Sequence, residues 1–322
     1  MAASRVSTLA QQQLITSNAL RTQRNVNDLQ VQIASGKKTQ SFSGIADDAG
    51  RLVNLKSELS QAEQFIQNIT ITEKRLDLMA FAMDQIEDVA RKARTDFAAA
   101  LNGSDADDIQ LSLLAQASLD QIVEIFNTKD DSRFLFSGGA IETKPVNLSN
   151  AAYTAPVPGS PPTFVQTVET GYYQGDAVVQ STRADDGFSV AYGINADESA
   201  FEKLIRTLDN VSNVTFTDPI TAQEKTFLTA AMTELTELID NNGVDKTLSD
   251  LRADIGLDRV ILDNIRDKHN DFLQFSKDSI AEIENIDPAE VITSLNFEQI
   301  QLEASFTTIA RIQTLSLSNF LR

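Results

Sequence analysis

Residues 52–69 read LVNLKSELSQAEQFIQNI, and this stretch decides the fold. Its apolar side chains recur at alternating steps of three and four residues, at Leu52, Leu55, Leu59, Ala62, Ile66 and Ile69. This spacing is the a/d heptad pattern of a helix that lies in a long coiled-coil seam. The stretch therefore predicts a coiled-coil helix.

A second apolar run continues the pattern, at Leu76, Met79, Met83, Ile86, Ala90, Ala93 and Phe97. The two runs are out of frame with each other, as a stammer between Ile69 and Leu76 would produce. A helix from about residue 45 to Asn102 would be roughly 90 Å long at ~1.5 Å per residue. Helices of ordinary globular domains are much shorter.

The C-terminal half carries a matching heptad frame, at Leu251, Ile255, Leu262, Ile265, His269, Phe272 and Ile283. Asp258 and Ser276 are polar members of that frame and are interpreted as register devices or solvent-facing gaps. Asp287, Pro288 and Glu290 then form an N-cap, an N1 proline and an N3 acid, which predicts a last helix reaching nearly to Arg322. Shorter helices are expected from Ser104 to about 127, over 198–208 and from 222 to Asn241.

The middle of the chain has a different composition. Four of the seven prolines fall within residues 156–162, so this segment is neither helix nor central strand. Residues 163–168 and 188–194 show the period of two expected of half-buried strands. We predict a mainly α fold: a long antiparallel coiled-coil helical bundle from both chain ends, with a small β-rich (α+β) inserted domain.

The predicted division has three parts. Terminal helical arms span 1–41 and 288–322 and form an inner coiled-coil layer. A helical bundle spans 42–140 and 222–287. The insert spans 141–221 and is expected to lie outermost.

Composition excludes most enzyme chemistry. The chain has 27 Lys+Arg against 46 Asp+Glu, no Cys and one His, for a formal charge of −19. Such an acidic surface repels nucleic acid, and we expect no metal site, no cofactor and no catalytic residues. The longest apolar run, 78–83, is too short to cross a membrane, and residues 1–13 show no cleavable secretory signal.

Two features could still be read as chemistry. His269 occupies a heptad position, so we interpret it as a structural histidine. The acid pairs at 47–48 and 130–131 leave a hydrolase as a distant alternative, although adjacent carboxylates are usually only solvated.

The arms instead suggest an interaction surface. Five basic residues face one acid within 1–41, at Arg5, Arg21, Arg24, Lys37 and Lys38 against Asp28. The apolar stripes of both arms are narrow, so we expect the arms to pair with each other and with neighbouring subunits, and to become ordered on assembly. The candidate assembly residues are Leu29, Ile33, Leu302, Phe306 and Ile309.

Four short segments carry a family resemblance. Residues 29–38 (LQVQIASGKK) and 47–50 (DDAG) resemble the signature that opens bacterial flagellins and their hook-associated relatives. Residues 127–139 (NTKDDSRFLFSGG) and 315–322 (LSLSNFLR) look more like the hook-filament junction branch than like filament flagellin. The Leu-Leu-Asp-Gly and Gln-Ala-Asn-Gln segments usual in flagellins are missing. The resemblance covers residues 1 to about 140 and about 240 to 322.

The resemblance implies a structural subunit, exported through the flagellar type III channel without a cleaved signal and assembled outside the cell in a helical or ring lattice. Its implied partners are copies of itself, a neighbouring hook-associated protein and flagellin, with room for an export chaperone. The implied role is to join hook and filament. Filament flagellin is the near alternative.

Overall fold

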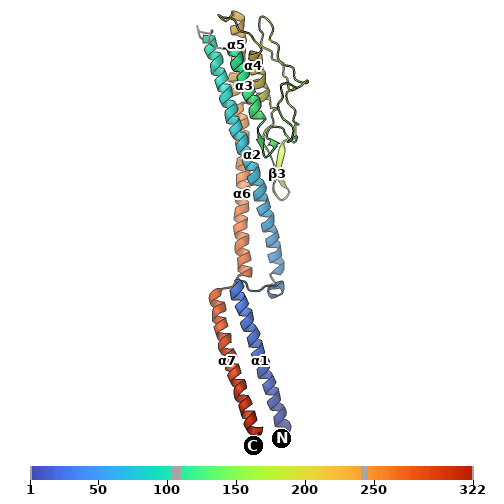
Figure 1. Ribbon diagram of the computed structural model, residues 1–322, viewed down its shortest axis with the longest axis vertical. Helices are drawn as coiled ribbons and strands as arrows, with labels where there is room; N and C mark the ends of the chain where they lie inside the picture. Colours follow the sequence, from blue (N-terminus) through green and yellow to red (C-terminus); the bar gives the residue numbers. More distant parts are fainter. Residues whose placement is uncertain (1, 103–109, 241–245, 321–322) are drawn as a thin grey trace. The chain divides into compact units, whose positions relative to one another are not determined.

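The computed structural model describes residues 2–102, 110–240 and 246–320. The predicted N-cap Ser104 and the predicted helix stop at 241–243 lie outside these residues. The helices and strands are α1 (Ala2–Ser35), η1 (Phe42–Ile45), α2 (Ala49–Asn102), α3 (Leu111–Phe126), β1 (Lys129–Asp130), β2 (Arg133–Phe134), β3 (Gln180–Asp185), β4 (Phe188–Tyr192), α4 (Ser199–Ser212), α5 (Ala222–Asp240), α6 (Leu248–Glu284) and α7 (Pro288–Phe320) (Figure 1). The predicted mainly helical fold, paired from both chain ends with small β hairpins in the middle, is confirmed.

Contacts divide the chain into two compact units, one of residues 1–61 and 271–322 and one of residues 62–270. The first unit holds the α1–α7 pair and the adjoining ends of α2 and α6. The second holds the rest of α2 and α6, the helices α3, α4 and α5, and the two hairpins. The three-part division expected from the sequence stays a prediction.

The large unit is organised by the seam of α2. Its buried positions run without interruption through Ala62, Phe65, Ile69, Thr72, Leu76 and Met79. The frame change therefore lies between Ala62 and Phe65, and the predicted stammer between Ile69 and Leu76 is wrong. The buried Thr72 concealed the frame, since a polar residue at a seam position does not register in an apolar pattern.

Ion pairs flank the antiparallel packing of α2 and α6. Asp84 pairs with Arg252 at 2.8 Å and Asp77 with Arg259 at 2.6 Å. Each pair lies seven residues from the next on both helices, which is the heptad spacing of a coiled-coil flank. The side chains are about half exposed, so these pairs specify register more than they add stability.

The polar members of the α6 frame pack inside the fold. The carboxylate of Asp258 accepts a hydrogen bond from the backbone N–H of Gly193 at 3.1 Å, and burial raises its pKa. His269 is buried, stacks on Phe65 and donates from Nε2 to the carbonyl of Ala184 at 2.8 Å. Asp258 and His269 therefore attach the β3–β4 hairpin to α6, and a structural role for His269 agrees with this geometry.

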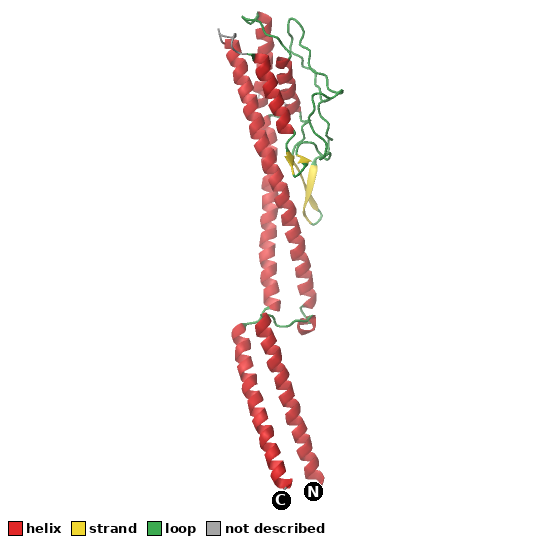
Figure 2. Ribbon diagram, viewed as in Figure 1, coloured by secondary structure: helices red, strands yellow, loops and turns green. Residues whose placement is uncertain are grey.

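The insert is mostly loop, with one antiparallel hairpin of β3 and β4 (Figure 2). The predicted strand at 188–194 is confirmed over residues 188–192 as β4, and the predicted helix at 198–208 is confirmed as α4. The predicted strand at 163–168 is wrong. Its backbone groups bond to side chains of α4 instead: Asn210 accepts from the N–H of Val165 at 3.0 Å and donates to its carbonyl at 3.1 Å.

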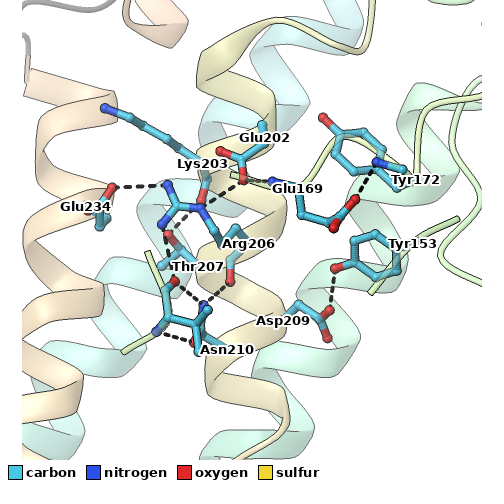
Figure 3. A network of polar contacts seen from close by, with 12 residues as sticks. Tyr153, Glu169, Tyr172, Glu202, Lys203, Arg206, Thr207, Asp209, Asn210 and Glu234 are labelled. Atoms are coloured by element: carbon cyan, nitrogen blue, oxygen red, sulfur yellow. Dashed lines mark hydrogen bonds and ion pairs between the residues drawn. The ribbon is translucent and has the colours of Figure 1, made fainter. Parts of the chain in front are cut away.

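This attachment extends into a buried polar network along α4 (Figure 3). Glu202 accepts from the guanidinium of Arg206 at 2.9 Å and from the backbone N–H of Glu169 at 3.1 Å. Tyr153 donates its hydroxyl hydrogen to Asp209, and burial raises the pKa of this phenol. Because 202, 206 and 210 are four residues apart, they share one face of α4 and hold an irregular chain there.

The turn at Ser137, Gly138 and Gly139 requires glycine for a steric reason. Gly138 has φ +66°, and a Cβ there would lie 2.4 Å from the carbonyl oxygen of Asp176. The carboxylate of Asp176 in turn accepts from the N–H of Gly139 at 2.6 Å. The backbone of the insert at Asp176 therefore packs directly against the backbone of this turn.

We expect Gly138→Ala to lower the free energy of unfolding by at least ~2 kcal/mol, because it adds a clash to the left-handed backbone. Gly187→Ala is the matched control. Gly187 has φ +67°, but a Cβ added there would meet no other atom within 4 Å. Gly187→Ala should therefore lower the free energy of unfolding by only ~1 kcal/mol. Urea unfolding of both variants measures the difference, and equal losses would contradict the steric account.

Candidate assembly interface

The terminal helices α1 and α7 lie side by side as a pair (Figure 1). Ala19, Thr22 and Val26 of α1 are buried against α7, and Val291 of α7 is buried in return. These are small or medium side chains, so the seam is narrow. The prediction that the two arms pair with each other is confirmed by this contact.

The structure separates the five candidate assembly residues into two groups. Leu29, Leu302 and Ile309 are half-buried, whereas Ile33 and Phe306 are exposed, Phe306 by 52%. Leu302, Phe306 and Ile309 follow each other at steps of four and three residues, the spacing expected of side chains that share one face of a helix. Leu302 and Ile309 are seven residues apart and do so, but Phe306 is rotated away from the seam.

A second apolar stripe points away from the seam and was missed in the sequence. On α7 it includes Phe297, 68% exposed, and Ile300, 67% exposed, and α1 separately exposes Leu20 and Val31. The sequence could have indicated this stripe, because these apolar residues do not belong to the heptad frame of the α1–α7 seam. So many large exposed side chains on one helix pair mark an interaction site.

The two connections between the arms and the rest of the first unit are clasped together. The carboxylate of Glu284 bridges the ammonium groups of Lys37, at 2.9 Å, and Lys56. The carbonyl of Glu284 accepts from the N–H of Lys38 at 2.7 Å, and that of Gly36 accepts from the N–H of Ile286 at 3.1 Å. Residues 36–38 belong to the sequence segment that carries the resemblance, and this clasp is their structural role.

The last helix begins as predicted. The carboxylate of Asp287 accepts hydrogen bonds from the backbone N–H groups of Ala289, at 2.8 Å, and Glu290, at 3.4 Å. Pro288 is the first residue of α7 and has no N–H to satisfy. This cap sets where the C-terminal arm starts.

The segment 127–139 is also structural. Asn127 ends α3, and its side-chain amide both donates to the carbonyl of Val146, at 3.0 Å, and accepts from its N–H, at 3.1 Å. Asp131 and Ser132 adopt positive φ values of 43° and 73° in the two-residue turn between β1 and β2. The segment therefore directs the chain into the insert. The closing segment 315–322 lies beyond the described side chains.

The acid pairs offer no catalytic arrangement. Asp130 pairs with Arg75 at 3.3 Å, Asp131 occupies the turn, and Asp47 and Asp48 are exposed. Across the described part of the chain no group of three or more His, Asp or Glu side chains is placed to hold a metal ion. Among the helices that the structure describes, none is long and apolar enough to cross a membrane.

Comparison with known proteins places this architecture. No family model matches the chain. Flagellar hook-associated protein 3 of Escherichia coli (strain K12) is 24% identical over 295 residues, which cover 89% of this chain and 90% of that protein. The chain is similar to this hook-associated protein over most of its length. The resemblance to hook-associated relatives of flagellin is confirmed.

Solved structures share the fold. A Vibrio parahaemolyticus protein provisionally named a flagellar hook-associated protein matches with a TM-score of 0.58 at 18% identity, over 75% of this chain and 100% of that one. Flagellar hook-associated protein 3 of Legionella pneumophila matches with a TM-score of 0.52 at 14% identity, over 72% and 98%.

The clasp makes stability depend on pH. Hydrogen bonds from Lys56 and Lys37 hold the pKa of Glu284 below its ordinary value, so its stabilisation is present above pH ~5 and is lost as pH falls through the lowered pKa. Glu284→Gln should therefore be less stable than wild type at pH 7, by up to ~1 kcal/mol, and match it near pH 3. Thermal melts at both pH values measure this. A gap that stays constant with pH would contradict the ionic clasp.

Proposed function

We propose that the chain is a structural subunit of the bacterial flagellum that joins the hook to the filament. The observation that carries this is the match to flagellar hook-associated protein 3 of Escherichia coli, because it covers 89% of this chain and 90% of that protein. The chain is a structural protein and not an enzyme. Its lone histidine donates to the carbonyl of Ala184, and Asp130 of the second acid pair forms an ion pair with Arg75.

The two stripes of the arms support assembly through the terminal helices. The side chains of one stripe are buried in the α1–α7 seam. The other stripe, with Phe297 and Ile300, is exposed and can contact other molecules. In the flagellum this stripe meets copies of the chain, a neighbouring hook-associated protein and flagellin. We further propose that the subunit is exported without a cleaved signal and that the arms gain their full order on assembly.

Deleting the gene should leave cells that build hooks, carry no filaments and release flagellin into the medium. Electron microscopy of the cells and immunoblots of the medium measure this, with the wild-type gene restored as control. A filament flagellin, the near alternative, would leave hook and junction intact on deletion. Normal filaments after deletion would contradict both the junction function and the flagellin function.

The outward stripe gives a second prediction. Phe297→Ser with Ile300→Ser should leave circular dichroism and the melting temperature of the monomer unchanged, because both side chains are already exposed. Each subunit would still lose ~1.5 to 3 kcal/mol of burial per side chain on assembly, so filaments should be absent. Val157→Ser, at an 81% exposed site in the insert, is the control and should leave assembly normal. Normal filaments in the double variant would show that this stripe is not needed for assembly.

A further inference from the structure

A polar groove runs between α1 and α7. Two adjoining hollows of about 610 and 620 Å³ make it up, and both are lined by Asn25 of α1 and Glu298 of α7. Small polar side chains such as Thr22 and Ser305 form one stretch, and Leu29 and Phe297 line the other. The helices do not fill this flank, so it has room for side chains of another helix.

Glu298 is incompletely satisfied in the groove. Its Oε1 accepts a hydrogen bond from Asn25 at 3.1 Å, whereas its Oε2 is buried and has no hydrogen-bond partner. A buried carboxylate oxygen without a donor is costly, and a cation is the partner that relieves the cost most. We therefore expect the carboxylate of Glu298 to bind a positively charged group that comes from outside the α1–α7 helix pair.

The chain itself carries a matching surface on another face of α1. Leu20 and Val31 are 55% and 46% exposed, and Arg24 lies between them and is exposed. Steps of four and seven residues place all three on one side of the helix. The groove is lined on α1 by other residues, among them Asn18, Thr22 and Asn25, so this stripe and the groove are separate surfaces.

We propose that the Leu20–Arg24–Val31 stripe of one copy docks in the α1–α7 groove of the next copy, with the guanidinium of Arg24 donating to Oε2 of Glu298. The guanidinium of Arg24 and the unpartnered carboxylate oxygen of Glu298 are complementary in charge, and one apolar end of the stripe matches the Leu29–Phe297 end of the groove. Since the two surfaces differ, the contact is head-to-tail and repeats into a ring or helix instead of closing as a dimer. This rests on the proposed function and names the partner of the assembly surface as a second copy.

Charge reversal tests the pairing in cells that lack the native gene. Arg24→Glu and Glu298→Lys should each reduce the number of filamented cells by at least about tenfold, and the double variant should restore most of them. Glu303→Lys, which reverses an exposed glutamate on the same helix, is the control and should behave as wild type. Immunoblots of the medium confirm that each variant is made and exported.

The outcomes separate this inference from the function on which it rests. If deletion abolishes filaments and the wild-type gene restores them, the function stands, and single variants that still support filaments overturn the pairing. Single variants that fail without rescue in the double variant overturn it too. Loss with Arg21→Gln but not with Arg24→Glu would also overturn it, because Arg21 lines the same groove and would then neutralise Glu298 within its own chain.

Cross-linking gives an independent measurement. The chain has no cysteine, so a variant with Arg24→Cys and Glu298→Cys has no background thiols. Oxidation of isolated hook–filament structures should then give a ladder of dimers, trimers and larger species on a denaturing gel. Arg24→Cys alone should stay monomeric on the gel, because position 24 faces position 298 of the next copy and not a second position 24. A double variant that remains monomeric in assembled structures would overturn the proposal.

Discussion

The antiparallel seam between α2 and α6 is the constraint on which the large unit depends. Burial at alternating three- and four-residue steps holds the helices together, and the flanking pairs Asp77–Arg259 and Asp84–Arg252 set their register. That register brings Phe65 of α2 opposite His269 of α6, where the β3–β4 hairpin attaches. A slip of one heptad would separate these residues and leave the hairpin without its anchor.

The insert shows how a chain with little regular structure is held in place. Its loops meet the polar face of α4, where Glu202, Arg206 and Asn210 satisfy backbone groups that a strand would otherwise pair. At the other end, Gly138 lets the chain pass at backbone contact with Asp176. Buried backbone groups need partners, and here side chains supply them in place of a sheet.

The arms differ from the large unit in which apolar side chains they bury. Their seam buries small residues such as Ala19 and Val26, while large ones such as Phe297 and Ile300 remain exposed. A monomeric protein would bury its largest apolar side chains first, because they contribute most to stability. The inverse arrangement is typical of a surface whose partner is another molecule, and the clasp at Glu284 joins this surface to the adjoining helices of its unit.

The sequence alone determined the helices, the antiparallel arrangement and the start of α7, because heptad spacing and capping are local and periodic signals. It also indicated that His269 is structural and that the arms pair. Only the tertiary structure decided that residues 163–168 are not a strand, since their backbone bonds to Asn210, 45 residues away. It also revealed the buried oxygen of Glu298 that has no hydrogen-bond partner. It placed Phe306 outside the seam as well, because a helix with apolar residues on two faces does not state which face its neighbour covers.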